Sequence, residues 1–494
     1  MRIIAPRRSD CQLQQNQRSV QPLAPTSNRF RAALAVLLCV WMTTVLVVNL
    51  PGHLTHDSLT QIAEGSSGYA QSWNPLFSSW VFGKLVNLTG GTEVIVAISV
   101  STVAAAIYLI LQAGPSTGWW PLIPIGLLLF TPILIIHPGV IWKDVWFAHL
   151  GLLGFALVAL RARGAGWWSE CLALVCLAAA MLSRQTGILI ALAGVAALSV
   201  VRQHGPVGTA HGLWPRWFRL AGWMPGLLLR TAALLAVAAG LGGVAKSQFK
   251  SIAGGEVGTG VRLVAIYDIA GMLQRLPGVH LERLRAEGFG TQAWEASARA
   301  TFSGERIDRL ELAPITGSKE LTQELILAQW FDLATANPLA YIQHRLEVFA
   351  WLSGLREQAK CIPVHVGVEA GPQTPTANLS LRPSRFAPLL YHWSRSFVNT
   401  PYFAPLFWAA WSIAVIALVV WRAGWRDPIV WLQLAGLAYW LSYLAAGLSC
   451  DFRYTYFSVL ASSVGVMYAC AGIPFRREPA DQRPTVAAAA SAPS

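Results

Sequence analysis

Long apolar runs restrict the fold of this chain more than any other feature of its sequence. A helix needs about 20 consecutive apolar residues to cross a bilayer, and in lipid only helices and closed barrels satisfy all their backbone hydrogen-bonding groups. With 54% hydrophobic and only 12% charged residues, the chain also carries more apolar surface than a soluble core would bury. The sequence therefore predicts an all-α polytopic membrane protein with about ten transmembrane helices. The expected spans cover residues 31–50, 93–113, 119–137, 144–160, 168–183, 186–201, 228–245, 402–421, 428–447 and 454–471.

The first apolar run is expected to stay in the protein as an anchor. It is as long as a full span, and Pro51, Gly52 and His53 follow it where a signal peptide would have a small-x-small cleavage motif.

Basic residues fix the expected orientation, because cytoplasmic loops carry an excess of Lys and Arg close to the spans. If the N-terminus is cytoplasmic, every basic cluster falls on that side, so the net charge of +13 reflects topology rather than nucleic-acid binding. The same rule places both ends of 168–201 in the cytoplasm, so the chain turns back near Arg184 on the outer side. The clusters are Arg2, Arg7, Arg8, Arg18, Arg29 and Arg31; Arg161 and Arg163; Arg202, Arg216, Arg219 and Arg230; Arg422 and Arg426; and Arg476 and Arg477.

This orientation divides the chain into five expected segments and indicates the membrane in which the protein lies. Composition rich in Ala, Leu, Arg and Trp points to a bacterial inner membrane, with both termini cytoplasmic and the outer loops periplasmic. The parts are a disordered cytoplasmic N-terminus (1–30), an N-terminal transmembrane module (31–245) with its first outer loop at 51–92, a large extracytoplasmic loop region between spans seven and eight (246–401), a C-terminal transmembrane module (402–472) and a disordered cytoplasmic tail (473–494).

The unusual polar residues all fall at the outer ends of the spans. We therefore expect a site at the outer mouth of the bundle. Its candidate members are His56 and Asp57 after the first span, Lys143 and Asp144 after the third, Arg184 after the fifth, Asp451 and Arg453 after the ninth, and Glu256, Arg262 and Asp268 in the large outer loop.

The first outer loop is expected to form two amphipathic helices along the membrane surface. Ser58 and Gln61 match a capping box, in which case Asp57 would only favour a helix N-terminus. Asn74 and Pro75 would begin the second helix.

Simpler explanations also exist for the other charged residues. Lys143 and Asp144 would be an interfacial pair, and Arg184 a turn residue. Asp451 and Arg453 resist this explanation, because they interrupt an apolar stretch in which an ion is costly unless it faces a partner or a cavity.

The order of several short segments resembles the GT-C superfamily of membrane glycosyltransferases, in particular the family 39-like members that use polyprenyl-phosphate sugars. The resemblance covers most of residues 31–470. Its segments are THDSLTQ after the first span, WNPLFSSW in the same loop, IWKDVWF, LSRQTG, FDLATANPLAYIQHRLEVFAWL and DFRYTYF.

The resemblance implies a helix bundle with an acidic residue at the start of the first outer loop. Many members carry two acids there, whereas this chain has His56 beside a single Asp57, so a metal bridged by paired carboxylates is not expected. His56 and Asp57 remain candidate ligands for a divalent metal, although two adjacent residues do not make a site.

The implied chemistry is attack by an acceptor on the anomeric carbon of a lipid-phosphate sugar. Asp57 would act as the base or orient the acceptor. Lys143, Arg184 and Arg453 would hold the phosphate, which is already a good leaving group. The implied partners are a polyprenyl-phosphate-linked sugar, an envelope glycan, lipid or protein acceptor, and membrane lipid, with no nucleic acid. His56, Asp144 and Asp451 would support the site.

The large outer loop predicts three further features. Residues 254–260 are glycine-rich without a nucleotide-binding pattern, which favours a flexible active-site loop in which Glu256, Arg262 and Asp268 meet substrate. Residues 323–352 predict a helix that restarts at Pro338 and packs back on the bundle through Leu339, Ile342, Leu346 and Phe349. Cys361 and Cys450 both lie on the outer side, where an oxidising compartment would allow them to pair, but their distance does not follow from the sequence.

Two other functions fit the same pattern. A flippase or transporter of lipid-linked sugars would carry its charges near the middle of its spans, often in repeated halves. An O-antigen-type polymerase or ligase shares the many spans, the large outer loop and the phosphate-binding arginines. The acid directly after the first span favours the glycosyltransferase.

Overall fold

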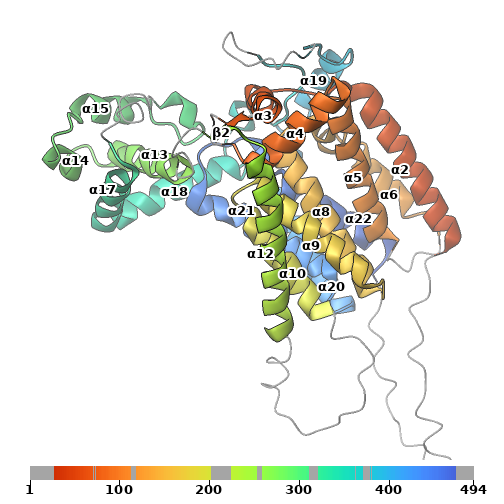
Figure 1. The fold of residues 1–494 in the computed structure, drawn as a ribbon. Helices are drawn as coiled ribbons and strands as arrows, with labels where there is room; N and C mark the ends of the chain where they lie inside the picture. The colour runs from red at the N-terminus through yellow and green to blue at the C-terminus, as the bar shows by residue number, and fades with distance from the viewer. Residues whose placement is uncertain are drawn as a thin grey trace, which may run out of the picture.

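The computed structural model describes residues 27–70, 72, 74–112, 118–201, 224–252, 259–310, 321–361, 363–370, 379 and 381–473. These residues form an all-α fold, as predicted, with a helical bundle, two helices across one end of it and a lobe at one side (Figure 1). The bundle helices are α2 (Asn28–Asn49), α5 (Glu93–Leu111), α6 (Leu122–Leu129), α7 (Pro132–Ile136), α8 (Lys143–Ala162), α9 (Trp167–Ser183), α10 (Gly187–Val201), α12 (Met224–Ser247), α20 (Pro405–Arg422), α21 (Pro428–Ala446) and α22 (Tyr456–Ala471).

The remaining elements lie outside these bundle helices. The lobe consists of α13 (Thr259–Arg275), α14 (Glu282–Ala286), α15 (Gln292–Thr301), α17 (Gln323–Ala336) and α18 (Pro338–Leu352). The others are α3 (His56–Ser67), α4 (Leu76–Thr89), α19 (Ala387–Arg395), the strands β1 (Tyr69–Ala70) and β2 (Ser251–Ile252), and the short 3₁₀ turns η1 (His137–Gly139), η4 (Ile307–Arg309), η5 (Gln358–Lys360), η6 (Pro401–Phe403) and η7 (Phe452–Thr455).

Several helices are long and apolar enough to cross a membrane. Among the described residues, seven meet this test, and one bent pair would make an eighth. Two shorter apolar helices, α9 with 17 residues and α10 with 15, occupy two further predicted spans. The chain is therefore a helical membrane protein, and the predicted total of about ten requires these two short helices to cross as well.

The third predicted span, 119–137, is not one straight helix. The segments Leu122–Leu129 and Pro132–Gly139 meet at an angle of 67°. Pro132 explains the break, because proline disfavours helical geometry in the preceding residue, and Thr131 is extended. The Trp41 indole donates a hydrogen bond of 2.9 Å to the Leu129 carbonyl, which the interrupted helix leaves without a partner.

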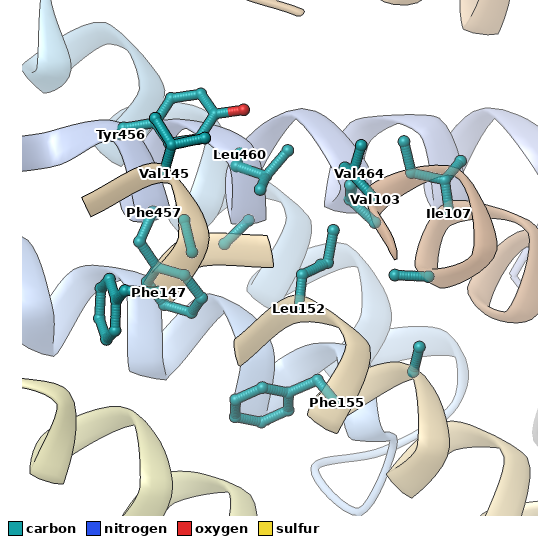
Figure 2. Close-up of a cluster of buried hydrophobic side chains, with 14 of the residues drawn as sticks. Val103, Ile107, Val145, Phe147, Leu152, Phe155, Tyr456, Phe457, Leu460 and Val464 are labelled. Carbon is teal, nitrogen blue, oxygen red and sulfur yellow. The ribbon is translucent and has the colours of Figure 1, made fainter. Parts of the chain in front are cut away.

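The centre of the bundle is formed by α8 and α22, the most buried of the candidate spans. Figure 2 shows Phe147, Leu152 and Phe155 of α8 packed among side chains of α5 and α22, including Phe457 and Leu460. Lys143 and Asp144 begin α8, and Arg453 lies in the turn η7 that directly precedes α22. The most tightly packed helices thus fix the positions of the charged residues at their ends.

The two predicted helices of the first outer loop are α3 and α4, which cross at very close range. Gly65 and Gly83 lie at the crossing, where neither position has room for a Cβ atom against the backbone of the other helix. The following β1 pairs in parallel with β2, with Tyr69 opposite Ser251, so the loop is also tied to the end of α12.

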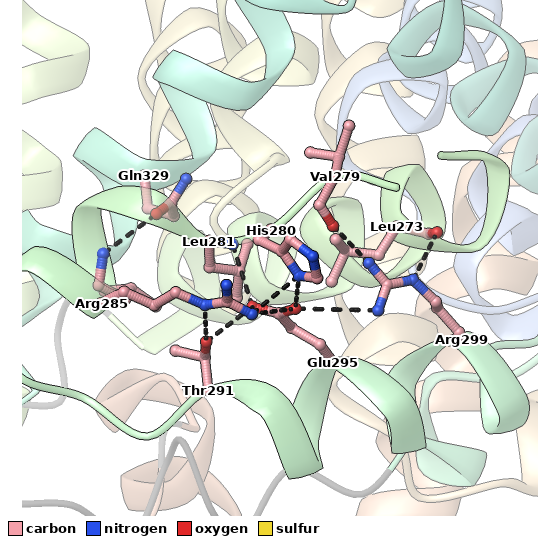
Figure 3. Close-up of polar contacts among 10 residues, drawn as sticks. Leu273, Val279, His280, Leu281, Arg285, Thr291, Glu295, Arg299 and Gln329 are labelled. Carbon is pink, nitrogen blue, oxygen red and sulfur yellow. Dashed lines mark hydrogen bonds and ion pairs between the residues drawn. The ribbon is translucent and has the colours of Figure 1, made fainter. Parts of the chain in front are cut away.

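The lobe has its own apolar core and a buried acidic hub. The Glu295 carboxylate receives hydrogen bonds from His280, Arg285, Thr291 and the Leu281 backbone (Figure 3). Burial alone would raise the pKa of Glu295, but these hydrogen bonds hold it below its usual value. The hub stabilises the connections around α14 and α15.

The predicted helix restart at Pro338 is confirmed, since α17 ends at Ala336 and α18 begins at Pro338. The prediction that this region packs back on the bundle is correct only for the end of α18. There the Phe349 ring lies 4.9 Å from the ring of Trp440 in α21. Leu339, Ile342 and Leu346 are exposed, because the opposite face of α18 packs against the lobe core.

Candidate functional site

The site begins at the N-terminus of α3, where Thr55 is the cap. The Thr55 hydroxyl accepts from the Ser58 backbone N–H, and the Ser58 side chain accepts from the Thr55 N–H. The predicted capping box of Ser58 and Gln61 is therefore wrong by one turn. Asp57 lies in the first turn, where its charge favours the helix N-terminus as expected.

Asp57 has a second contact that capping does not explain. Arg453 donates from Nη1 to Asp57 Oδ2 at 2.9 Å and from Nε to Asp451 Oδ2 at 2.7 Å. Asp57 is the most exposed of the three, with 29% of its side chain accessible against 17% for Arg453 and 9% for Asp451. Among the described residues, the Arg453 hydrogen bond reaches Asp57 Oδ2 and not Oδ1.

Asp451 is the buried end of this chain of charges. Burial raises its pKa above the ordinary value, although the Arg453 guanidinium acts in the opposite direction. The Asp451 side chain also accepts from the Arg453 backbone N–H at 3.1 Å, which caps the turn η7. Asp451 therefore holds Arg453 in position from two directions.

The second ion pair joins Arg184 to Asp144 and is more deeply buried. Arg184 Nη1 contacts Asp144 Oδ1, and only 3% of the Asp144 side chain is exposed. Three tyrosine rings, those of Tyr439, Tyr443 and Tyr454, lie within 5.1 to 5.9 Å of the guanidinium carbon. Arg184 is thus enclosed by one carboxylate and an aromatic cage, an environment that favours a cation.

Lys143 does not pair with its neighbour Asp144. Its amine donates to Asn74 Oδ1 at 2.5 Å, and Gln61 donates to the same oxygen at 3.3 Å. The charges of Asp57, Arg184, Arg453 and Glu64 all act on the Lys143 amine, which places it in the same electrostatic field. Asn74 of the WNPLFSSW segment was expected only to begin a helix, so its role in holding Lys143 is new.

The remaining candidate residues do not all lie beside Asp57. His56 is the first residue of α3, next to Asp57, and Arg262 lies in the first turn of α13. Glu256 lies outside the described residues. Asp268 is fully buried in the lobe, where it receives hydrogen bonds from His344 and Trp330 and an ion pair from Arg345.

Those contacts hold Asp268 inside the lobe, and the expectation that it meets substrate stays a prediction. Arg345 also donates to the Gly447 carbonyl at 2.9 Å. The Asp268 network therefore fastens the lobe to the C-terminal end of α21.

Aromatic residues of the site went unnoticed in the sequence. The Trp142 ring lies 5.1 Å from the guanidinium carbon of Arg453, and its indole donates to the Thr55 hydroxyl at 3.0 Å. Trp142 therefore links the cap of α3 to Arg453. The spacing of Tyr439 and Tyr443 by four residues, which places both on one helix face, was the available signal for the aromatic cage.

A second element missed by the sequence is the strap, residues 363–370, which returns from the large loop to the start of α3. The Leu54 N–H donates to the Gly367 carbonyl at 2.9 Å, and the Glu369 N–H donates to the Leu54 carbonyl at 2.8 Å. His365 donates from Nε2 to the Leu54 carbonyl at 2.9 Å, and its ring lies 5.8 Å from that of Trp142. Burial lowers the pKa of His365.

A disulfide lies beside the strap. Cys361 and Cys450 are bonded, with their Cα atoms 5.3 Å apart, which answers the question that the sequence left open. Cys361 lies two residues before the strap, and Cys450 directly precedes Asp451. One covalent bond therefore joins the large loop to the segment that carries Asp451 and Arg453.

The site contains charges that suit an anion more than a metal. Within the described ranges, no group of three or more His, Cys, Asp or Glu side chains is arranged to hold a metal ion. Lys143, Arg184 and Arg453 provide three cations, and Asp57 provides the most accessible carboxylate. Such an arrangement can bind a phosphate and place a carboxylate beside it.

No family model matches the chain, and no curated protein sequence matches it significantly.

Proposed function

We propose that the protein is an integral-membrane glycosyltransferase. It transfers a sugar from a polyprenyl-phosphate donor to an envelope glycan, lipid or protein acceptor on the extracytoplasmic side. The observation that carries this proposal is the contact between Asp57 and Arg453, which puts an accessible carboxylate beside a phosphate-binding type of cation.

In this mechanism Asp57 accepts the proton of the acceptor hydroxyl or amine, or orients it, as the nucleophile attacks the anomeric carbon. The bond from that carbon to the phosphate oxygen breaks, and the lipid phosphate leaves with the electron pair. Arg453 and Lys143 stabilise the charge on the departing phosphate, and Arg184 adds to the field from its tyrosine cage. Direct displacement inverts the anomeric centre.

The donor phosphate would compete with Asp57 for Arg453. Because the bond of Asp57 to Arg453 uses only Oδ2, a phosphate that binds Arg453 would release this oxygen as the donor arrives. The released oxygen would then be available to hydrogen-bond the acceptor hydroxyl or amine.

The disulfide supports the proposed orientation. Disulfides persist in oxidising compartments, so Cys361 and Cys450 favour an extracytoplasmic position for the site that they adjoin. Together with the basic clusters that the sequence predicts to be cytoplasmic, this favours a bacterial inner membrane with the site in the periplasm.

The position of the charges argues for this function over a transporter. Asp57, Lys143 and Asp144 lie in the first turns of their helices, and Arg184 follows the end of α9. A transporter would be expected to place coupled charges near the middle of its spans.

Mass spectrometry of envelope lipids and glycans tests the proposal. The comparison uses cells without the protein, cells with it, and cells with Asp57→Asn. In the deletion and in Asp57→Asn, a polyprenyl-phosphate sugar should accumulate while one glycan loses a residue, and the lost mass names the sugar. An altered envelope in the deletion with a wild-type envelope in Asp57→Asn would favour a polymerase, ligase or flippase.

A further inference from the structure

One helix of the lobe exposes an apolar face that the glycosyltransferase proposal does not use. The α18 stripe consists of Leu339, Ile342 and Leu346, each more than half exposed, and Phe331 within α17 is exposed as well. The spacing of three and four residues places the stripe on one side of the helix. Large contiguous apolar patches on a soluble surface usually mark an interaction site.

The exposed face of α18 also carries no charge. Its other exposed residues are Pro338 and Gln343, while Arg345 is buried and Glu347 is half-buried against Arg275. The lobe differs on another side, where α14 exposes Glu282 and Arg283. Exposure to water is therefore favourable for the charged α14 side of the lobe and unfavourable for the apolar α18 stripe.

Contacts with the bundle fix the level of α18 relative to the membrane. Arg345 donates to the carbonyl of Gly447, the residue directly after α21, and Val348 lies against the same glycine. Phe349 then reaches Trp440, six residues before the end of α21 and so about 9 Å further along the axis of that candidate span. The end of α18 thus lies below the outer end of a helix that is long enough to cross the bilayer.

The candidate span that α18 contacts also exposes apolar side chains. Leu441 and Leu444 are exposed on α21. Figure 1 shows α17 and α18 on the lower side of the lobe, toward which the bundle helices run, and α15 on the upper side. Amphipathic helices of this kind insert their apolar face about 5–10 Å into the lipid headgroup region.

We propose that the α18 stripe lies in the outer leaflet of the bilayer, so that the lobe rests on lipid beside the site. In this arrangement α18 is an interfacial helix whose apolar stripe contacts lipid. Its opposite face packs against the lobe core, and the Asp268 network fastens the lobe to α21. This inference does not depend on the proposed glycosyl transfer.

Quenching by brominated lipid tests the position of the stripe in the full-length protein. Single cysteines are introduced by Ile342→Cys or Leu346→Cys in a chain whose unpaired cysteines are replaced by serine and whose Cys361–Cys450 bond is kept. Each is labelled with bimane and reconstituted into phosphatidylcholine and phosphatidylglycerol vesicles with brominated phosphatidylcholine. Ala296→Cys, exposed on α15, is the matched control in water, and Leu441→Cys is the reference in lipid.

Quenching at 342 and 346 should approach that at 441 and exceed that at 296 by about threefold or more. Equal quenching at 342 and 296 would overturn the proposal. Weak lipid quenching at 342 together with concentration-dependent self-quenching of the label would overturn it as well, and would assign the stripe to contact with a second copy of the chain.

Discussion

Arg184 and Asp144 form the most enclosed ion pair of the site, and their burial makes each partner costly to lose. We expect Asp144→Asn to lower the free energy of unfolding by about 3–5 kcal/mol, because the Arg184 charge would stay buried without its carboxylate. Unfolding of the purified protein in mild detergent measures the loss. Asp144→Asn/Arg184→Gln removes both charges and should recover part of it, whereas equal losses in the two variants would show that the ion pair is not the cause.

His53 connects the end of α2 to the strap and gives the fold a pH dependence. Its Nε2–H donates to Asn49 Oδ1 at 2.8 Å, and its Nδ1 accepts from the Gly367 N–H at 3.0 Å, so the ring is held neutral. Burial, with smaller effects from His365 and His137, lowers the pKa of His53 from 6.5 to about 3.

The unfolded state therefore binds more protons than the folded state between pH 6.5 and 3. We expect stability to fall as the pH drops below 6.5, with His53 contributing about 2 kcal/mol between pH 7.5 and 5. Melting temperatures at these two pH values measure the effect. His53→Gln should be less stable at pH 7.5 but less sensitive to pH, and an unchanged pH dependence in His53→Gln would contradict this assignment.

Single residues of the site were predictable from the sequence, but their partners were not. An ion at the end of an apolar span stands out, which identified Asp57, Lys143, Arg184 and Arg453 as candidates. Asp57 and Arg453 are 396 positions apart, however, and no local pattern records such a pairing. Asn74 and the Trp142 ring were missed because an amide and an aromatic ring are ordinary at these positions.

At the scale of secondary-structure elements, the crossing of α3 and α4 determines where Asp57 and Asn74 lie. Ala ordinarily stabilises a helix by about 1 kcal/mol relative to Gly. Gly65→Ala should instead destabilise the protein, because the added methyl group would overlap the Ser79 backbone. Gly240→Ala on α12 is the matched control, since a Cβ atom there meets open space. Thermal unfolding in detergent compares them, and similar behaviour of the two variants would argue against a tight crossing.

Element boundaries followed the sequence well where the apolar pattern was long, as in α2, α5 and α21. The break in the third predicted span was missed although Pro132 marked it, because hydropathy over a window of about 19 residues averages across a single proline. The strap was missed altogether. Its docking beside Leu54 depends on backbone hydrogen bonds, which carry no side-chain signature.

At the scale of the whole molecule, the Cys361–Cys450 bond joins the two halves of the outer face. If this face is extracytoplasmic, both thiols should be blocked in intact cells and should react with a membrane-impermeant maleimide only after reduction. Mass spectrometry of the labelled peptides measures this. Reaction of Cys361 and Cys450 before reduction would contradict the bond, and failure to react after treatment with an impermeant reductant would contradict the orientation.

The fold class and the gathering of charges at one end were accessible from the sequence, because lipid restricts backbone structure and charge placement strongly. The lobe could not be predicted in this way, because its helices pack as in a soluble protein and are not restricted by lipid. Its position also depends on the contact of Arg345 with Gly447. That contact also explains why Asp268, an acid in a candidate substrate loop, has a structural role.

The most direct test of the central claim is transfer by purified protein with Asp57 altered. Wild-type protein, Asp57→Asn and the matched control Asp332→Asn, which alters an exposed ion pair on the lobe, are each added in vesicles to detergent-treated envelopes of cells lacking the protein. Mass spectrometry follows the missing glycan residue and the release of polyprenyl phosphate. Wild type and Asp332→Asn should restore both, and Asp57→Asn should restore neither while melting within a few degrees of wild type. Restoration by Asp57→Asn at the wild-type rate would contradict the account.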